Sequence, residues 1–370
     1  MKKIIYCACI AVACLVSTVS CNKEGGTGEV INDGKSEVRF TLRSDVKMSG
    51  STRANGVIEQ SGFRLHAFRK NIANGDFQFY KEIDLSGMSY SGNQLSGKLR
   101  LDAGTYKFVP SYGLTGSYNN WLSIADGAVL RNDIYITHPP LVPVPEIFQD
   151  HTPIEQLPEW EITLAGEQAQ DISATIHRSV GRVDVLFIGA QRVNGAIVAD
   201  PSKTPLGGYM IESLGFNFSG LSPRMNLAGG IPAGDAGQAH TFELSQPNET
   251  VIMGTGTHKG SVLDDYILFD EITPEYVPAG GAYFVGPYLF PQYGDDNVTG
   301  ASITISNGNP ASARTITVVD PIPVEQNKVT IIVVWVLSDN IYSAEFQFVV
   351  TVDTVWDGTH IVDGGVIDEE

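Results

Sequence analysis

The residue types that carry out catalysis are present in this chain but scattered. The histidines form no pair four residues apart and have no nearby carboxylates in the spacing of a zinc site. These are His66, His138, His151, His177, His240, His258 and His360. The chain also lacks the G-x-S-x-G elbow of hydrolases and the phosphate-binding P-loop. The sequence therefore predicts a protein that is not an enzyme and that needs no metal or other cofactor.

Two acidic runs leave one alternative open. Asp264-Asp265 and Asp295-Asp296-Asn297 offer several oxygen ligands of the kind that Ca²⁺ prefers. Gly294 and its neighbours are turn residues, so we favour solvated turns over calcium sites.

The N-terminus has the pattern of a secretory leader. Lys2 and Lys3 precede an apolar run at residues 4–16, and small residues lead from there to Cys21. The run is shorter than the ~18 to 20 residues that a transmembrane helix needs. The leader also contains three of the four cysteines, Cys7, Cys9 and Cys14. Its removal leaves Cys21 as the only cysteine, which excludes an intramolecular disulfide.

The residues at the end of the leader point to lipid attachment. Thr18-Val19-Ser20-Cys21 resembles the lipobox of bacterial lipoproteins, with threonine where leucine is usual. This resemblance implies that residues 1–20 are a signal peptide and that Cys21 carries acyl chains such as palmitate, which hold the precursor at the outer membrane. The alternative is an ordinary leader cut near Ser20, which would leave a free thiol in an oxidising compartment.

The stretch from Ser36 to Asn55 combines a strand with an exposed loop. Val38, Phe40 and Leu42 alternate with polar residues, the period of two that marks a half-buried strand. The segment from Met48 to Asn55 has no apolar period and contains a single basic residue, Arg53. We expect this loop to be open to proteolysis, and a cut there would release the strand together with the anchor.

Composition limits the partners and the domain count. Without the two lysines of the leader, the chain has 22 basic and 42 acidic residues, which gives a formal net charge of minus 20. Such a charge argues against binding nucleic acid. The roughly 350 remaining residues exceed the ~250 to 300 at which single cores stop growing. We therefore expect two domains, residues 55–168 and 169–370, behind a lipidated segment at residues 21–54.

Most of the chain reads as short strands separated by glycine and proline, which predicts an all-β fold of sandwiches. The expected strands are Phe63–Arg69, Thr105–Val109, Gln170–His177, Arg182–Ile188, Tyr209–Phe218, Tyr283–Val285, Ala301–Ile305, Thr315–Val319, Val329–Leu337 and Ala344–Val352. A short helix is expected within Asn119–Leu130, and a turn at Trp356-Asp357-Gly358.

A group of aromatic residues supports a second class of function. Tyr112, Tyr118 and Trp121 lie close together in a polar segment, and exposed rings of this kind can stack on sugars. A lectin-like surface lipoprotein that binds glycans or a host protein is therefore an alternative. We favour burial of these rings inside the sandwich, because large aromatic residues are mostly buried.

Several motifs, taken in order, resemble the FimA-type fimbrillins of Bacteroidales. Besides the lipobox and the first strand, they are Ser51-Thr52-Arg53-Ala54, the segment from Ile176 to Val185, the segment from Ile322 to Val329 and the ending from Val350 to Gly358. The resemblance covers nearly the whole chain. It implies two tandem transthyretin-like β-sandwich domains and a type V pilin, a subunit of adhesive surface fimbriae.

The same resemblance implies how the subunit is processed. An arginine-specific protease would cut between Arg53 and Ala54, and the shortened chain would then polymerise with copies of itself or with other pilins. Arg39 and Arg43 fit this cut less well, since they lie within the predicted strand. Stalk, tip and anchor roles all remain open, as do the receptor and the protease.

The end of the chain suggests a partner for the groove that the first strand would leave. Ile361-Val362 and Val366-Ile367 are short apolar pieces separated by Asp363-Gly364-Gly365. As a hypothesis, this tail is the donor strand that pairs with the next subunit. A frayed acidic terminus is the equally weighted alternative.

Overall fold

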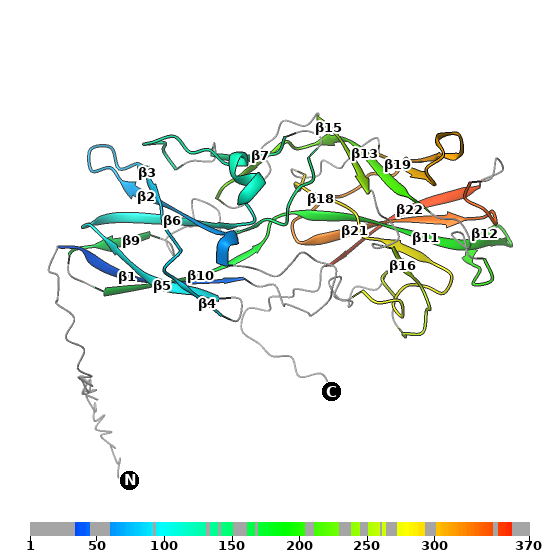
Figure 1. The fold of residues 1–370 in the computed structure, drawn as a ribbon, viewed down its shortest axis with the longest axis horizontal. Coiled ribbons are helices and arrows are strands. Elements are labelled where there is room, and N and C mark those ends of the chain that lie inside the picture. The colour runs from blue at the N-terminus through cyan, green and yellow to red at the C-terminus, as the bar shows by residue number, and fades with distance from the viewer. Residues whose placement is uncertain are drawn as a thin grey trace, which may run out of the picture. The chain divides into compact units, whose positions relative to one another are not determined.

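The fold is nearly all β, as the computed structural model shows (Figure 1). The structure describes residues 34–44, 60–91, 94–130, 134–139, 142–150, 161–166, 169–203, 211–228, 238–244, 251–259, 261–263, 272–292, 301–342 and 347–356. From Gly34 onward these residues belong to one compact unit. The all-β prediction is confirmed.

The first sheet is built mostly from the N-terminal half of the chain. Its strands follow the order β3 (Phe77–Glu82), β2 (Phe63–Lys70), β6 (Gly104–Tyr112), β8 (Phe148–Gln149), β10 (Ala169–Arg178), β1 (Ser36–Ser44), β5 (Gln94–Leu101) and β4 (Ser89–Ser91), and β9 (Glu161–Leu164) pairs with β6. β1 and β6 are separated by two strands in this order, yet Phe40 of β1 and Phe108 of β6 are in ring contact. The sheet therefore curls over its own apolar core.

A second group of strands forms two stacked sheets. The larger has the order β16 (Val251–Met253), β17 (Ala282–Phe284), β11 (Gly181–Val193), β21 (Lys328–Val336) and β22 (Phe348–Trp356), and β12 (Ala196–Ala199) and β18 (Tyr288–Leu289) also pair with β11. The smaller has the order β15 (Gln238–Leu244), β13 (Ser213–Leu221), β19 (Ala301–Ser306) and β20 (Arg314–Val318). β14 (Arg224–Asn226) and β7 (Tyr135–Thr137) form a separate pair.

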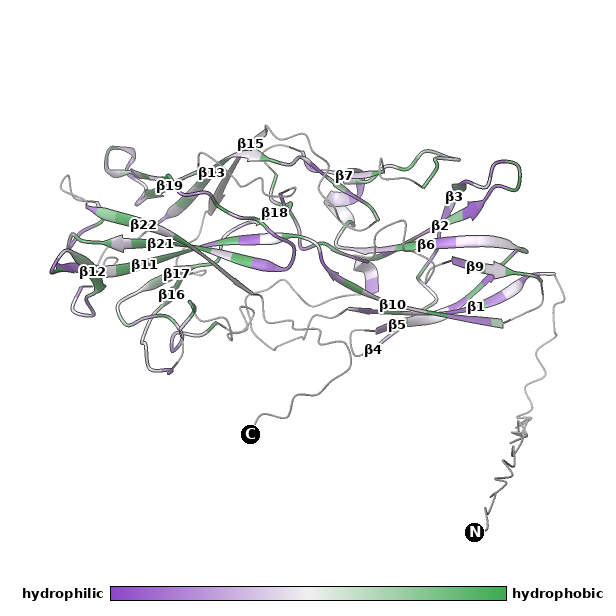
Figure 2. Ribbon diagram, turned by 180° about the vertical axis from the view of Figure 1, so that it is seen from behind, coloured by the Kyte–Doolittle hydropathy of each residue, from purple (hydrophilic) through white to green (hydrophobic). Residues whose placement is uncertain are grey.

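Strands β11 and β21 are buried on both faces, which explains their nearly continuous apolar sequences. Val185 and Ile332 pack into the core that also contains Phe216 of the smaller sheet. Leu186 and Ile331, on the opposite face, pack into another core with Val277. The two strands run parallel and pair over eight residues. The hydrophobic residues of these strands are green in Figure 2.

A buried charged group lies at the start of β11. Asp184 is fully buried, and its carboxylate accepts hydrogen bonds from Arg182 Nη2 at 2.9 Å and from the backbone N–H of Gly286 at 2.8 Å. The hydroxyl of Tyr283 also donates to Asp184. Burial, aided by the negative charge of Asp184, raises the pKa of Tyr283 well above its usual value, so the hydroxyl keeps its proton. The carboxylate thus has a partner for each oxygen.

Some predicted boundaries differ from the observed ones. A short 3₁₀-helix, η2 (Gly116–Trp121), replaces the helix expected within Asn119–Leu130. The strand expected at Ala344–Val352 is observed as β22, which extends to Trp356, so the first residue of the expected turn still pairs with Lys328. β22 and β21 each have nine residues, so every residue of β22 has a partner on β21. The β-branched residues of β22 also favour the extended conformation of a strand. Asp357 and Gly358 lie outside the described residues.

The predicted division into domains stays a prediction. β10 begins at Ala169, the first residue assigned to the second domain, yet it pairs with β1 and β8 of the first sheet. Its Ile172 and Ile176 are buried in the core of that sheet.

Candidate strand-exchange site

Strand β1 lies in the middle of the first sheet. It pairs in parallel with β10, from Glu37 opposite Ala169 to Ser44 opposite Ile176. On its other side it pairs antiparallel with β5, from Ser36 opposite Leu101 to Arg43 opposite Gln94. Backbone groups of β1 are therefore satisfied along both edges, as in any central strand.

The inward face of β1 is completely buried. Val38, Phe40 and Leu42 have exposed fractions of 0%, 1% and 0%. The ring centroids of Phe40 and Phe108 lie 5.9 Å apart with an angle of 64° between the planes, an edge-to-face contact. These three side chains were predicted to share one face, and their alternating burial confirms it.

The outward face of β1 carries a network of exposed ion pairs. Glu37 accepts a hydrogen bond from Arg39 Nε at 3.1 Å and lies 3.3 Å from Lys98 Nζ of β5. The hydrogen bond from Lys98, followed by that from Arg39, lowers the pKa of Glu37. Arg43 Nε donates to the side-chain oxygen of Gln94 at 3.1 Å. Exposed pairs of this kind contribute little to stability, so β1 is held mainly by its inward face and its backbone.

Typical free energies show how much stability the fold would lose without β1. Burial of Val38, Phe40 and Leu42 stabilises the fold by ~1.5 to 3 kcal/mol for each side chain, and each backbone hydrogen bond adds a net ~1 kcal/mol. The total is comparable with the ~5 to 15 kcal/mol that stabilises an entire domain. A sheet without β1 would also expose two unpaired strand edges, those of β5 and β10.

The next described element after β1 is η1 (Gln60–Gly62). The side-chain amide of Gln60 donates to the carbonyl oxygens of Leu85 at 3.0 Å and of Met88 at 2.8 Å. Because Met88 contributes to the same core as β1, these hydrogen bonds fix η1 beside that core.

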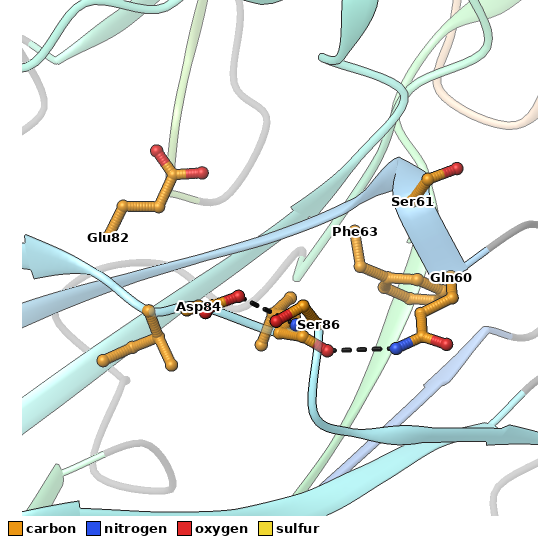
Figure 3. Close-up of a pocket in the computed structure, with 8 residues that line it drawn as sticks. Gln60, Ser61, Phe63, Glu82, Asp84 and Ser86 are labelled. Atoms are coloured by element: carbon orange, nitrogen blue, oxygen red, sulfur yellow. Dashed lines mark hydrogen bonds between the residues drawn. The ribbon is translucent and has the colours of Figure 1, made fainter.

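A cavity of about 610 Å³ lies beside Gln60. It is lined by Gln60, Ser61, Phe63, Glu82, Ile83, Asp84, Leu85 and Ser86, most of which are labelled in Figure 3. A hydrogen bond from the backbone N–H of Ser86 lowers the pKa of Asp84, and one from Arg64 lowers the pKa of Glu82. A lowered pKa makes each carboxylate a weaker base, and each already accepts a hydrogen bond from within the fold, so neither is tuned for general-base catalysis.

Several predicted site residues lie outside the described residues. These are Cys21, Arg53, Ala54, Ile361, Val362, Val366 and Ile367, together with the acidic runs at Asp264-Asp265 and Asp295-Asp296-Asn297. Of the predicted site residues, Val38, Phe40 and Leu42 are described, and they share the inward face of β1. Within the part of the chain that is described, no group of three or more His, Cys, Asp or Glu residues could hold a metal ion.

The aromatic residues proposed for sugar stacking are largely enclosed. Trp121 is 3% exposed, and its ring contacts those of Tyr118, His138 and Phe290 at centroid distances of 5.2, 5.0 and 6.3 Å. Tyr112 is partly buried and packs edge-to-face against Phe63. The favoured interpretation, burial within the fold, is thus confirmed for Trp121.

Sequence reasoning missed the strand that pairs with β1 on one side. β5 places Leu95, Gly97, Leu99 and Leu101 at alternate positions. Those leucines give the period of two that identifies a half-buried strand, and this signal could have found β5. The glycine hides the pattern, because glycine weakens strand propensity.

Comparisons with known proteins concern the fold. No family model matches the chain, and no curated protein matches it. Within the described residues, no helix is both long and apolar enough to span a membrane.

Solved structures that resemble the chain include three fimbrial proteins. The tip fimbrial protein Mfa3 of Porphyromonas gingivalis, truncated at its C-terminus, is 9% identical, with 87% of this chain and 99% of that one covered and a TM-score of 0.40. The fimbrial anchor protein Mfa2 of the same organism is 8% identical, with 86% and 97% covered and a TM-score of 0.37. A fimbrial assembly protein from Parabacteroides distasonis is 14% identical, with 86% and 98% covered and a TM-score of 0.38.

Proposed function

We propose that this chain is a non-enzymatic subunit of adhesive surface fimbriae that assembles by strand exchange after its N-terminal segment has been cut off. The position of β1 carries this proposal. β1 is a central strand with three buried side chains, and it precedes the loop that contains Arg53. A single cut after Arg53 would leave β1 attached to the fold by noncovalent contacts alone.

The consequence of that cut follows from the contacts of β1. Its departure would open a groove between β5 and β10, lined by the side chains that now enclose Val38, Phe40 and Leu42. Exposed apolar surface and unpaired strand edges favour the addition of a strand from another chain. Assembly with other subunits, either copies or other pilins, would repair the defect.

Anchoring of the precursor is the second part of the proposal. Acylation of Cys21 after removal of residues 1–20 would hold the precursor at the outer membrane. The cut between Arg53 and Ala54 by an arginine-specific protease would then separate the subunit from its anchor and place it in a fimbrium at the cell surface.

The N-terminus of the surface species tests the proposal. Mass spectrometry of surface material sheared from cells should find subunits that begin at Ala54 and lack peptides from residues 22–53. A tip subunit would give the same new N-terminus but a different stoichiometry in the fibre. An anchor subunit would keep its acylated Cys21 and would be isolated together with other pilins. Surface material that retains an acylated Cys21 and contains no other pilin would instead identify a monomeric lipoprotein that binds glycans or a host protein.

A further inference from the structure

The side chains that border the groove of β1 differ in size along its length. The cross-strand partners on β5 are Leu99 for Val38, Gly97 for Phe40 and Leu95 for Leu42. Opposing residues of an antiparallel pair project on the same face of the sheet. The two outer positions are therefore bordered by leucine side chains, whereas the middle position is bordered by a residue that has none.

The absence of a side chain at Gly97 makes room for two large neighbours. A Cβ atom at Gly97 would lie 2.5 Å from Cγ of Met88, so the Met88 side chain passes directly over the glycine. On the β10 side the partner of Phe40 is Ile172, which is 4% exposed. Phe108 closes the site with its ring 5.9 Å from that of Phe40. Gly97, Met88, Ile172 and Phe108 thus form a site with the size of an aromatic ring, which we call the ring site.

The tail of this chain does not match the ring site. In an extended tail, alternate residues read Ile361, Asp363, Gly365 and Ile367 on one side, and Val362, Gly364 and Val366 on the other. Either side would place aspartate or glycine between its apolar residues. Aspartate would bring an unpaired charge into an apolar site, and glycine would leave the site empty.

We infer that the groove left by β1 selects an extended segment with apolar side chains at three alternate positions and an aromatic ring in the middle, and that a protein of different sequence supplies it. This inference rests on the proposed function, since it concerns the same groove after processing. It assigns the subunit to a mixed fibre in which the C-terminal tail of a second copy is not the donor.

Peptide binding to the processed protein tests the selection. The protein without its leader is cut with trypsin, and the N-terminal fragment is removed in mild denaturant before refolding. Four fluorescent peptides are then titrated by anisotropy. They are Ser36–Ser44, the same peptide with Phe40→Gly, the same peptide with Thr41→Gly, and the tail Thr359–Glu370. Thr41→Gly is the matched control, because it adds the same backbone freedom on the outward face.

The expected result is a strong dependence on the ring. The Ser36–Ser44 peptide should bind, and the Phe40→Gly peptide should bind at least about 100-fold more weakly, as expected for truncation of a buried phenylalanine. The Thr41→Gly peptide should stay within about 10-fold of the parent, given the cost of one added glycine. The tail should bind at least about 100-fold more weakly than the parent.

Two outcomes would contradict the inference in different ways. Should the tail bind as tightly as Ser36–Ser44, or the Phe40→Gly peptide lose no more than the Thr41→Gly peptide, the groove does not select for the ring, and the proposed function stands. Should the Ser36–Ser44 peptide fail to bind the processed protein, β1 does not exchange, and both the inference and the proposed function fall.

Discussion

Phe40 of β1 meets Phe108 of β6 edge to face, with ring centroids 5.9 Å apart, although β8 and β10 lie between the two strands in the sheet. This contact crosses the core from one part of the curled sheet to another. Because β1 bridges the core in this way, its stability and its removal concern the entire first sheet. Removal of β1 would therefore change the packing of the entire first sheet.

Truncation of Phe40 should show how much β1 depends on its inward face. Phe40→Ala in the uncut protein should lower the free energy of unfolding by about 3 to 5 kcal/mol, since it leaves a cavity in a packed core. Guanidinium denaturation measures the change. Thr41→Ala, on the outward face, is the control and should stay within about 1 kcal/mol. Equal effects of the two substitutions would show that β1 is not held by its buried side chains.

The first site of limited proteolysis should be Arg53. Trypsin should cut the folded precursor after Arg53 before it cuts elsewhere, and Arg53→Ala should block both this cut and assembly. Arg39→Ala is the control, because Arg39 lies within β1 and its backbone is paired on both sides. Mass spectrometry of early digests identifies the cut. A first cut after Arg131, Arg192 or Arg224 would contradict the proposed processing site.

If Cys21 carries the lipid, its replacement should change the cell fraction in which the precursor is found. Cys21→Ala should abolish acylation and move the precursor from the membrane to the soluble fraction, because a chain without acyl groups has no anchor of the proposed kind. Partition into detergent, followed by immunoblotting, measures this shift. A Cys21→Ala precursor that stays with the membrane would refute the lipoprotein assignment.

The buried His66 should make stability depend on pH. Burial, together with the positive charge of Arg64, lowers the pKa of His66 to about 4. The unfolded state, with a histidine pKa near ~6.5, therefore binds more protons than the folded state between these values. Stability should be fully present above about pH 6.5 and should fall by about 2 to 4 kcal/mol as the pH is lowered to 4.

Substitutions isolate that pH dependence. His66→Leu should make the slope between pH 6.5 and 4 clearly shallower, and His138, whose pKa is also lowered by burial, should account for part of the slope that is left. Urea denaturation at a series of pH values gives the slopes. The ion pair between Arg64 and Glu82 is expected to weaken only at the acid end of this window, because the pKa of Glu82 is lowered. If the pH dependence of the free energy of unfolding is unchanged by His66→Leu, it arises from other titratable groups.

The buried carboxylate of Asp184 should be essential for the second group of strands. Asp184→Asn leaves Arg182, which is 6% exposed, without its counter-charge, and should cost about 3 to 5 kcal/mol. Asp171→Asn is the matched control, because the Asp171 side chain is 77% exposed and lies 3.8 Å from Arg39. Its effect should stay within about 1 kcal/mol. Thermal unfolding of both variants measures the difference.

Much of the strand content was predictable from local patterns. The alternation of Val38, Phe40 and Leu42 identified β1, and the apolar runs from Arg182 and from Val329 identified β11 and β21. Such patterns succeed because side chains on a strand point to opposite faces in turn. They failed at β5, where Gly97 interrupts the leucines, and they ended β22 too early, at Val352, although the strand extends to Trp356.

The sequence by itself determined the period of β1, the position of Arg53 after that strand, and the presence of a single cysteine, Cys21, beyond Cys14. These are local properties, which depend on residue type and order alone. Only the tertiary structure decided that β1 lies between β5 and β10, that Phe40 faces Gly97, and that Trp121 is enclosed by other rings. Each of these facts joins segments far apart in the chain, and pairing between distant strands is set by the packing of the entire core rather than by any local pattern.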